Sequence, residues 1–337
     1  MADATRILGD PEWLAHRFVG SDDAFRFIRV ARADHAQVPF LTDDHLGNRE
    51  CAGDIPAGAC LAELAEPPLH FLFHSAFCGS TMLVRALSQP GVAMGLSEPQ
   101  VLNDVVGFRR RGADPRAVAR AADGATRLIG RPFAAGEAVI VKPSNVINPL
   151  THVLMALRPS SRAVFLHVPL ETFLVSVANK GMHCRIWARE LLQGYLLEGA
   201  VEGMGFTRDD LFRQSDLQVA AVGWLVQHRL FAALAAKTGD RMASLDGDLM
   251  FADMANALLA VATHYGLSLD VEAAMGGRAV ARHSKSGDAY SAQTRADDYA
   301  RVRAAHGDEI DMVLAWSQAV AGAAGISLTA AKPLLQA

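Results

Sequence analysis

The sequence predicts an α/β fold: a parallel sheet flanked by helices on both faces, with an N-terminal extension and a helical C-terminal part. Three observations support this prediction. Short, continuous apolar segments alternate with longer helical segments, which is the pattern of a sheet covered on both faces. One apolar segment runs through a turn of small residues directly into a helix. The last third of the chain is rich in alanine, the residue that favours helices most.

Residues 1–66 form the predicted N-terminal extension, packed on the core. We expect an amphipathic helix near residues 11–19 and an extended segment around residues 25–31. Pro67 and Pro68 mark the boundary, because proline lacks a backbone N–H and interrupts regular structure. Residues 67–337 contain no repeat and no low-complexity linker, so we expect a single core domain there.

Five apolar segments of this domain are predicted to be strands, over residues 69–75, 92–96, 138–142, 162–168 and 242–245. Helices are predicted over residues 80–88, 115–129 and 171–237, the last broken near residues 203–205. From residue 253 onward we expect mainly helix, with a polar interruption at residues 278–299.

Composition limits the function classes. A formal net charge of −4 provides no broad basic surface, which argues against a nucleic-acid partner. The four cysteines are widely spaced, so we expect neither a disulfide framework nor a zinc site, and no metal. The N-terminus has no apolar run behind a basic start, and no stretch approaches the roughly 20 apolar residues of a membrane span. We therefore expect a cytoplasmic protein without a membrane partner.

The segment from Phe71 to Arg85 carries the most chemical information. An apolar strand leads into a turn of small residues, and a helix begins at Ser80 and Thr81. Unpaired backbone N–H groups and the positive end of a helix dipole would then point to one place, which favours an anion. The spacing fits the P-loop pattern GxxxxGK[ST], except that His74 stands at the first glycine and Ser80 at the lysine. The alternative is a buried strand followed by an ordinary capped helix.

This strand, its Gly-Ser-Thr loop ending and the apolar helix resemble the 5′-phosphosulfate loop of the sulfotransferases, which use 3′-phosphoadenosine 5′-phosphosulfate (PAPS). The resemblance implies a P-loop-type sheet and a loop that holds the donor's 5′-phosphate and sulfuryl group. The implied donor-binding residues of the loop are Phe77, Cys78, Gly79, Ser80 and Thr81. The family usually has Lys or Arg where this sequence has Phe77, so another cation is expected. Arg85 is one candidate, and an arginine with only a structural role is the alternative.

Two later segments extend the resemblance. The family has Arg-x-Pro at the end of a strand and a serine on the following helix, both of which bind the donor's 3′-phosphate. Here a strand ends in His167-Val-Pro and the next helix carries Ser176, so the resemblance implies that these two residues flank that phosphate. Residues 244–253 and a later His-Tyr-Gly-Leu resemble the family's Tyr-Glu-Asp-Leu segment with its helix, which extends the likeness over roughly residues 67–270. The alternative is that His167 caps a strand and Ser176 faces a neighbouring helix.

Three residues are candidates for catalysis. Lys142 ends a predicted strand, and open α/β sheets place ligands at the carboxyl ends of their strands. Glu98 follows the second strand, and some sulfotransferases use a glutamate in this region as the base that deprotonates the acceptor hydroxyl. Histidine does this in other members, which adds His74 and keeps His183 in consideration. A lysine that extends along a sheet edge and a glutamate that caps a turn are the structural alternatives.

Two basic segments can supply the missing positive charge. Residues 180–189 contain three cations, among which Arg185 is the expected donor ligand. Residues 278–285 include Arg282 and Lys285, and the family often closes the 3′-phosphate site with a late basic loop of this kind. A solvated connection is the alternative for both segments.

Other chemistries fit the sequence less well. Cys78 and Met82 occupy the glycine positions of a GxSxG elbow around Ser80, which argues against a serine hydrolase. The leading hypothesis is therefore transfer of a sulfuryl group from PAPS to a hydroxyl or amine of a small molecule or peptide. A P-loop phosphotransferase using ATP and a non-catalytic protein with the same fold are the alternatives. A homodimer is left open.

Overall fold

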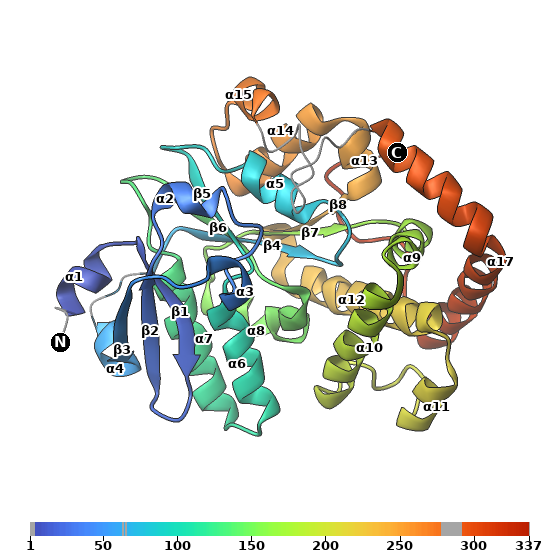
Figure 1. The fold of residues 1–337 in the computed structure, drawn as a ribbon, viewed down its shortest axis with the longest axis horizontal. Helices are drawn as coiled ribbons and strands as arrows, with labels where there is room; N and C mark the ends of the chain where they lie inside the picture. The colour runs from blue at the N-terminus through green and yellow to red at the C-terminus, as the bar shows by residue number, and fades with distance from the viewer. Residues whose placement is uncertain (1–3, 63, 65, 278–291, 337) are drawn as a thin grey trace. The chain divides into compact units, whose positions relative to one another are not determined.

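The computed structural model describes residues 4–62, 64, 66–277 and 292–336. Its strands form two sheets, an antiparallel one of three strands and a parallel one of five (Figure 1). The strands of the first sheet are β1 (Trp13–Val19), β2 (Ala24–Arg29) and β3 (Cys51–Pro56), in that order. The second sheet has the order β5 (Ala93–Ser97), β6 (Ala138–Lys142), β4 (Leu69–His74), β7 (Ala163–His167) and β8 (Met242–Asp246). The predicted α/β fold with a parallel sheet flanked by helices is confirmed.

The helices before β7 are α1 (Ala4–Gly9), α2 (Arg32–His35), α3 (Asp43–Leu46), α4 (Ala57–Ala62), α5 (Ser80–Ala86), α6 (Gln100–Arg110), α7 (Pro115–Ile129), the 3₁₀ helix η1 (Asn145–Leu150) and α8 (Thr151–Leu157). Those after it are α9 (Leu170–Asn179), α10 (Gly181–Leu197), α11 (Arg208–Arg213), α12 (Asp216–Thr238), η2 (Gly239–Arg241), α13 (Gly247–Ala252), α14 (Met254–Tyr265), α15 (Val271–Gly276) and α17 (Ala292–Ala324).

The described residues group into two compact units. Unit 1 comprises those of Met1–Phe73, Ser80–Val164 and Leu258–Gly287, and unit 2 comprises those of His74–Gly79, Phe165–Ala257 and Asp288–Ala337. The division into an extension over residues 1–66 and a single domain from residue 67 stays a prediction.

Strand β1 corrects the sequence analysis, because the helix predicted over residues 11–19 is wrong. This segment pairs antiparallel with β2, from Trp13 opposite Arg29 to Val19 opposite Ala24. Helices α6 and α7 pack on β1 within unit 1 (Figure 1). The spacing of apolar residues along this segment suggested one face of a helix. In the structure, pairing with β2 provides hydrogen-bond partners for its backbone groups, and packing buries its apolar side chains. The extended segment predicted around residues 25–31 is confirmed as β2.

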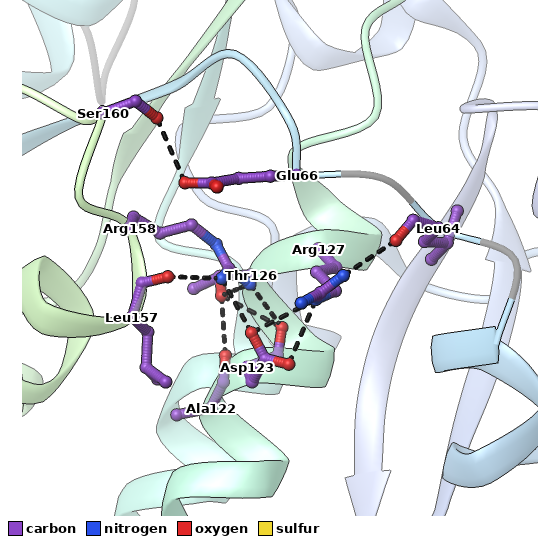
Figure 2. A network of polar contacts seen from close by, with 9 residues as sticks. All are labelled: Leu64, Glu66, Ala122, Asp123, Thr126, Arg127, Leu157, Arg158 and Ser160. Atoms are coloured by element: carbon purple, nitrogen blue, oxygen red, sulfur yellow. Dashed lines mark hydrogen bonds and ion pairs between the residues drawn. The ribbon is translucent and has the colours of Figure 1, made fainter.

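A buried arginine fixes helix α7 in unit 1. Arg158, whose side chain is 1% exposed, donates to the Asp123 carboxylate, the Asp123 carbonyl and Oγ1 of Thr126, each at 2.7 Å. Figure 2 shows the guanidinium directed at this turn of α7, while Arg127 reaches out to the carbonyl of Leu64 at 2.8 Å. The segment that leads into β4 is thereby tied to α7. A buried guanidinium needs such partners, because an unsatisfied charge in the interior is costly.

Unit 2 is built around helix α12, which packs against α9, α10 and α17. In the described part of the chain, one segment, Asp216–Arg241, is long and apolar enough to cross a membrane, with a mean hydropathy of 1.4. However, 72% of that apolar window is buried inside the protein, as in the core helix of a water-soluble protein. No such stretch was predicted from the sequence, and the burial of this helix explains why it is apolar on most of its faces.

Candidate functional site

The loop between β4 and α5, residues 74–79, adopts an unusual backbone conformation. Ala76, Phe77 and Gly79 have φ angles of 74°, 54° and 84°. Positive φ is uncommon for alanine and phenylalanine and costs about 1–3 kcal/mol per residue where the surroundings impose it. Such loops cluster at functional sites, and successive N–H groups near left-handed residues form concave anion-binding arrangements. The loop thus combines positive φ angles at Ala76, Phe77 and Gly79, and its role as an anion site stays a prediction.

Neighbouring elements of unit 2 hold this loop in place. The N–H of Ser75 donates to the carbonyl of Leu166 in β7 at 3.1 Å. The N–H of Ala76 donates to Nδ1 of His74 at 3.1 Å, which places the proton of a neutral His74 ring on Nε2. A Cβ on Gly247, at the start of α13, would lie only 2.9 Å from the carbonyl oxygen of Cys78. The loop is thus clamped between the end of β7 and the beginning of α13.

Gly79 meets two requirements that only glycine satisfies. Its φ of 84° is unfavourable for any side chain. A Cβ would also lie 2.8 Å from Cζ of Phe251 and 2.9 Å from Cε of Met250, both on α13. Ser80 and Thr81 follow directly and begin α5, with 7% and 4% of their surface exposed.

Phe77, which stands where the family has a cation, lies in an aromatic cluster. Its ring centroid is 5.8 Å from that of Phe173 and 5.1 Å from that of Trp187, the latter edge-on. Nζ of Lys180 lies over the Phe77 ring, 5.5 Å from its centroid. A positive charge therefore lies beside the loop in unit 2, although the loop sequence contains none. Lys180 belongs to the basic segment over residues 180–189, in which Arg185 was the predicted donor ligand.

His167, the last residue of β7, is buried and 7% exposed, and its Nδ1 has no hydrogen-bond partner. Its ring lies edge-on to His228, with centroids 5.1 Å apart, and His228 stacks on Trp224 at 3.5 Å. Burial lowers the pKa of His167, against the opposing effect of Asp246, and lowers the pKa of His228 well below its usual value. His167 is therefore a neutral hydrogen-bonding group with an available nitrogen, not a cation.

A second cation near the loop was missed by the sequence analysis. Arg295, near the start of α17, lies over the ring of Phe251, with 4.4 Å from its guanidinium carbon to the ring centroid. It also forms an ion pair with Asp248 of α13. Phe251 is the residue whose ring closes over Gly79. No motif marks Arg295, because the contact depends on how α17 packs against α13.

In unit 1, the structure brings two candidate catalytic residues together. Nζ of Lys142 donates to Oε1 of Glu98 at 2.5 Å, and the N–H of Glu98 donates to the carbonyl of Lys142 at 2.6 Å. The side chain of Lys142 is 1% exposed and that of Glu98 is 18% exposed. Glu98 has a φ of 51°, and the Phe40 ring lies 5.0 Å from Nζ of Lys142. Lys142 is thus a buried cation paired with a strained glutamate, and it does not extend along a sheet edge to solvent.

The remaining candidates lie as follows. Ser176 is half-buried on α9, and His183 is exposed on α10. Arg185, also on α10, forms ion pairs with Asp216 at 3.7 Å and Glu309 at 3.8 Å. Arg85 in unit 1 donates to the carbonyl of Val38 at 2.7 Å. Arg282 and Lys285 lie outside the described residues. In the described part of the chain, no group of three or more His, Cys, Asp or Glu side chains is arranged to hold a metal ion.

Comparisons with known proteins find structural likeness only. The chain is similar to the sulfotransferase domain of the Synechococcus PCC 7002 olefin synthase, with 13% identity and a TM-score of 0.38 over 69% of this chain and 84% of that domain. It is also similar to the sulfotransferase STF9 from Mycobacterium avium, with 10% identity and a TM-score of 0.43 over 74% of this chain and 79% of that one. No family model and no curated protein sequence matches the chain. This likeness concerns the fold and assigns no residue a role.

Proposed function

We propose that this protein transfers a sulfuryl group from PAPS to a hydroxyl or amine of a small molecule or peptide. The observation that carries the proposal is the conformation of residues 74–79, with three positive φ angles in a loop clamped by β7 and α13. Strain of this kind persists where a backbone must present its N–H groups to a ligand. The order of the sulfotransferase-like segments along the sequence supports PAPS as the ligand.

The residues present fit such a donor. Gly79 provides the positive φ of 84° that the loop needs and lets Phe251 and Met250 of α13 pack directly against its backbone. Nδ1 of His167, buried and without a hydrogen-bond partner, suits a phosphate oxygen if the proton of its ring lies on that nitrogen. Ser176 would add a hydroxyl beside the 3′-phosphate, and the hydroxyls of Ser80 and Thr81 would hold the 5′ end. When bound, PAPS supplies an activated sulfuryl group.

Glu98 and Lys142 are proposed to act on the acceptor. A carboxylate that accepts the proton of the acceptor hydroxyl raises the nucleophilicity of its oxygen. The ammonium of Lys142, 2.5 Å from Oε1, holds the carboxylate of Glu98 in a fixed orientation. We further propose a cytoplasmic location, no nucleic-acid or membrane partner and no metal requirement; a homodimer is one arrangement to test.

Calorimetric titration with adenosine 3′,5′-bisphosphate, the product that PAPS leaves, tests the proposal directly. We expect binding in the micromolar range, with no comparable heat from Mg-ATP. Ser80→Ala and Thr81→Val should weaken binding, whereas Thr263→Val, an exposed threonine on α14, should not. Absence of binding at about 1 mM, the scale of weak ligands, would refute the proposal. Binding of Mg-ATP instead would select the phosphotransferase alternative.

A further inference from the structure

His167 lies beside the proposed donor loop, at the carboxyl end of β7. Its neighbour Leu166 accepts a hydrogen bond from the N–H of Ser75 at 3.1 Å. A Cβ on Gly247 would lie 2.9 Å from the carbonyl oxygen of Cys78 and 3.1 Å from that of His167, so the loop and the end of β7 meet at this glycine. The loop, residues 74–79, contains neither lysine nor arginine. His167 is therefore a group next to the loop that can acquire a full positive charge.

The surroundings of His167 act on its charge in opposite directions. Burial lowers its pKa, whereas Asp246, the backbone of Val168 and Asp248 raise it. Both carboxylates are held in place, because Asp246 caps α13 and Asp248 pairs with Arg295. Nδ1 of His167 is buried and has no hydrogen-bond partner. An imidazole in this balance is neutral at pH 7, and one more negative charge beside it favours the protonated ring.

Other described elements of unit 2 next to His167 also carry titratable groups. His228 of α12 lies edge-on to His167, with ring centroids 5.1 Å apart, and burial lowers its pKa well below the usual value. On the loop, His74 is bonded through Nδ1 and Cys78 is completely buried. Glu171, in the first turn of α9, is bonded to α17. Because His228 stays neutral, the two histidines hold one proton without a second positive charge beside it.

We propose that His167 takes up one proton when the 3′-phosphate of the donor binds, so that the positive charge of the site forms together with the complex. The inference rests on the proposed function. The proton passes from the solvent to a ring nitrogen of His167, and both ring nitrogens are then donors. The imidazolium makes a charge-assisted hydrogen bond to a phosphate oxygen, and no bond of the nucleotide forms or breaks. Donor binding therefore strengthens as the pH falls, whereas a site with an arginine keeps its charge throughout.

Calorimetric titration with adenosine 3′,5′-bisphosphate in HEPES and in Tris, two buffers with different ionisation enthalpies, counts the protons taken up on binding. At pH 7 we expect the wild type to take up about half a proton or more per nucleotide. Its affinity should fall about three- to tenfold from pH 7 to pH 8, because one linked proton changes affinity by at most about tenfold per pH unit. Phosphate groups with a second pKa of about 6 are largely ionised over this range, so the nucleotide itself contributes little.

Substitutions at position 167 separate proton uptake from hydrogen bonding. His167→Gln keeps a polar side chain that does not titrate, so it should take up no proton and bind about tenfold more weakly at pH 7, with no dependence on pH. His167→Arg supplies a permanent charge, so it should also lose the pH dependence and bind at pH 8 at least as tightly as the wild type. His306→Gln, which replaces a half-buried histidine of α17, is the matched control and should behave like the wild type.

The outcomes separate the two proposals. If the wild type binds the nucleotide without proton uptake, the inference is refuted while the proposed function stands, and this result needs no variant. If His167→Gln takes up as many protons as the wild type, the proton goes to another group, which also overturns the inference. If the wild type binds no adenosine 3′,5′-bisphosphate, both proposals fail.

Discussion

Removing Glu98 should destabilise unit 1 strongly, because Lys142 depends on it. Lys142 is completely buried, and its ammonium lies 2.5 Å from Oε1 of Glu98. Loss of one partner of a buried ion pair costs about 3–5 kcal/mol, since the other charge stays in the interior. Glu98 is 18% exposed, so water can partly replace its carboxylate. We therefore expect Glu98→Ala to lower the free energy of unfolding by about 3 kcal/mol.

The double substitution distinguishes this mechanism from a general packing defect. Lys142→Met with Glu98→Ala removes both charges and leaves an apolar side chain in the interior, which is often close to neutral. The double variant should therefore be more stable than Glu98→Ala alone, with a coupling energy of about 2 kcal/mol or more. A φ of 51° is about as unfavourable for alanine as for glutamate. Backbone strain at position 98 therefore contributes little to the difference in stability between the wild type and Glu98→Ala.

Urea unfolding at pH 7, followed by circular dichroism, measures these free energies. Asp240→Ala serves as a control, because it breaks an ion pair with Lys332 in which the carboxylate is fully exposed, and it should change stability little. A cost below about 1 kcal/mol for Glu98→Ala would refute the reasoning. So would strict additivity of the two single substitutions in the double variant.

Three further predictions concern buried groups of unit 1. Burial lowers the pKa of His35 to about 4, and neither ring nitrogen has a hydrogen-bond partner. As the pH falls from 6.5 towards 4, the unfolded chain binds this proton and the native state does not, so up to about 3 kcal/mol of stability is lost. His35→Phe should stabilise the protein and remove that share of the pH dependence in urea unfolding at pH 7 and 5; an unchanged slope would contradict this. Arg131 donates to four backbone carbonyls within residues 7–13. Arg131→Met should therefore lower the free energy of unfolding by about 3 kcal/mol or more and expose the N-terminal segment to trypsin. An unchanged digestion pattern would count against this prediction. Burial raises the pKa of the Cys60 thiol to about 11, whereas Cys51 is exposed. At pH 8 a thiol reagent should therefore react in a fast phase at Cys51 and slowly at Cys60. Cys51→Ser should abolish the fast phase of the reaction.

Much of the parallel sheet could be predicted from local patterns. The strand over residues 138–142 and the helix over residues 115–129 have the bounds that the sequence analysis gave them. The helix begins where Asp114 accepts hydrogen bonds from two backbone N–H groups and Pro115 occupies the first turn. These signals are local, because a cap and a continuous apolar segment need only adjacent residues to act.

The error at β1 has the opposite cause. Trp13, Leu14 and Ala15 are all buried, so the segment shows no strict alternation that would identify a strand. Its conformation is decided by its partner β2 and by the helices of unit 1 that cover it. Propensity yields to such tertiary pairing wherever both faces of a strand are covered.

The same distinction between local signals and tertiary packing applies to the candidate site. The sequence by itself determined the loop at residues 74–79 and its continuation into a helix, since glycine and small residues encode backbone conformation locally. Only the tertiary structure decided which charges lie beside which residues: Lys180 over Phe77, and Lys142 against Glu98. These partners are far apart in the chain, and no local pattern specifies them. They meet because the packing of buried apolar elements brings them together, and the electrostatics of the site follows from that packing.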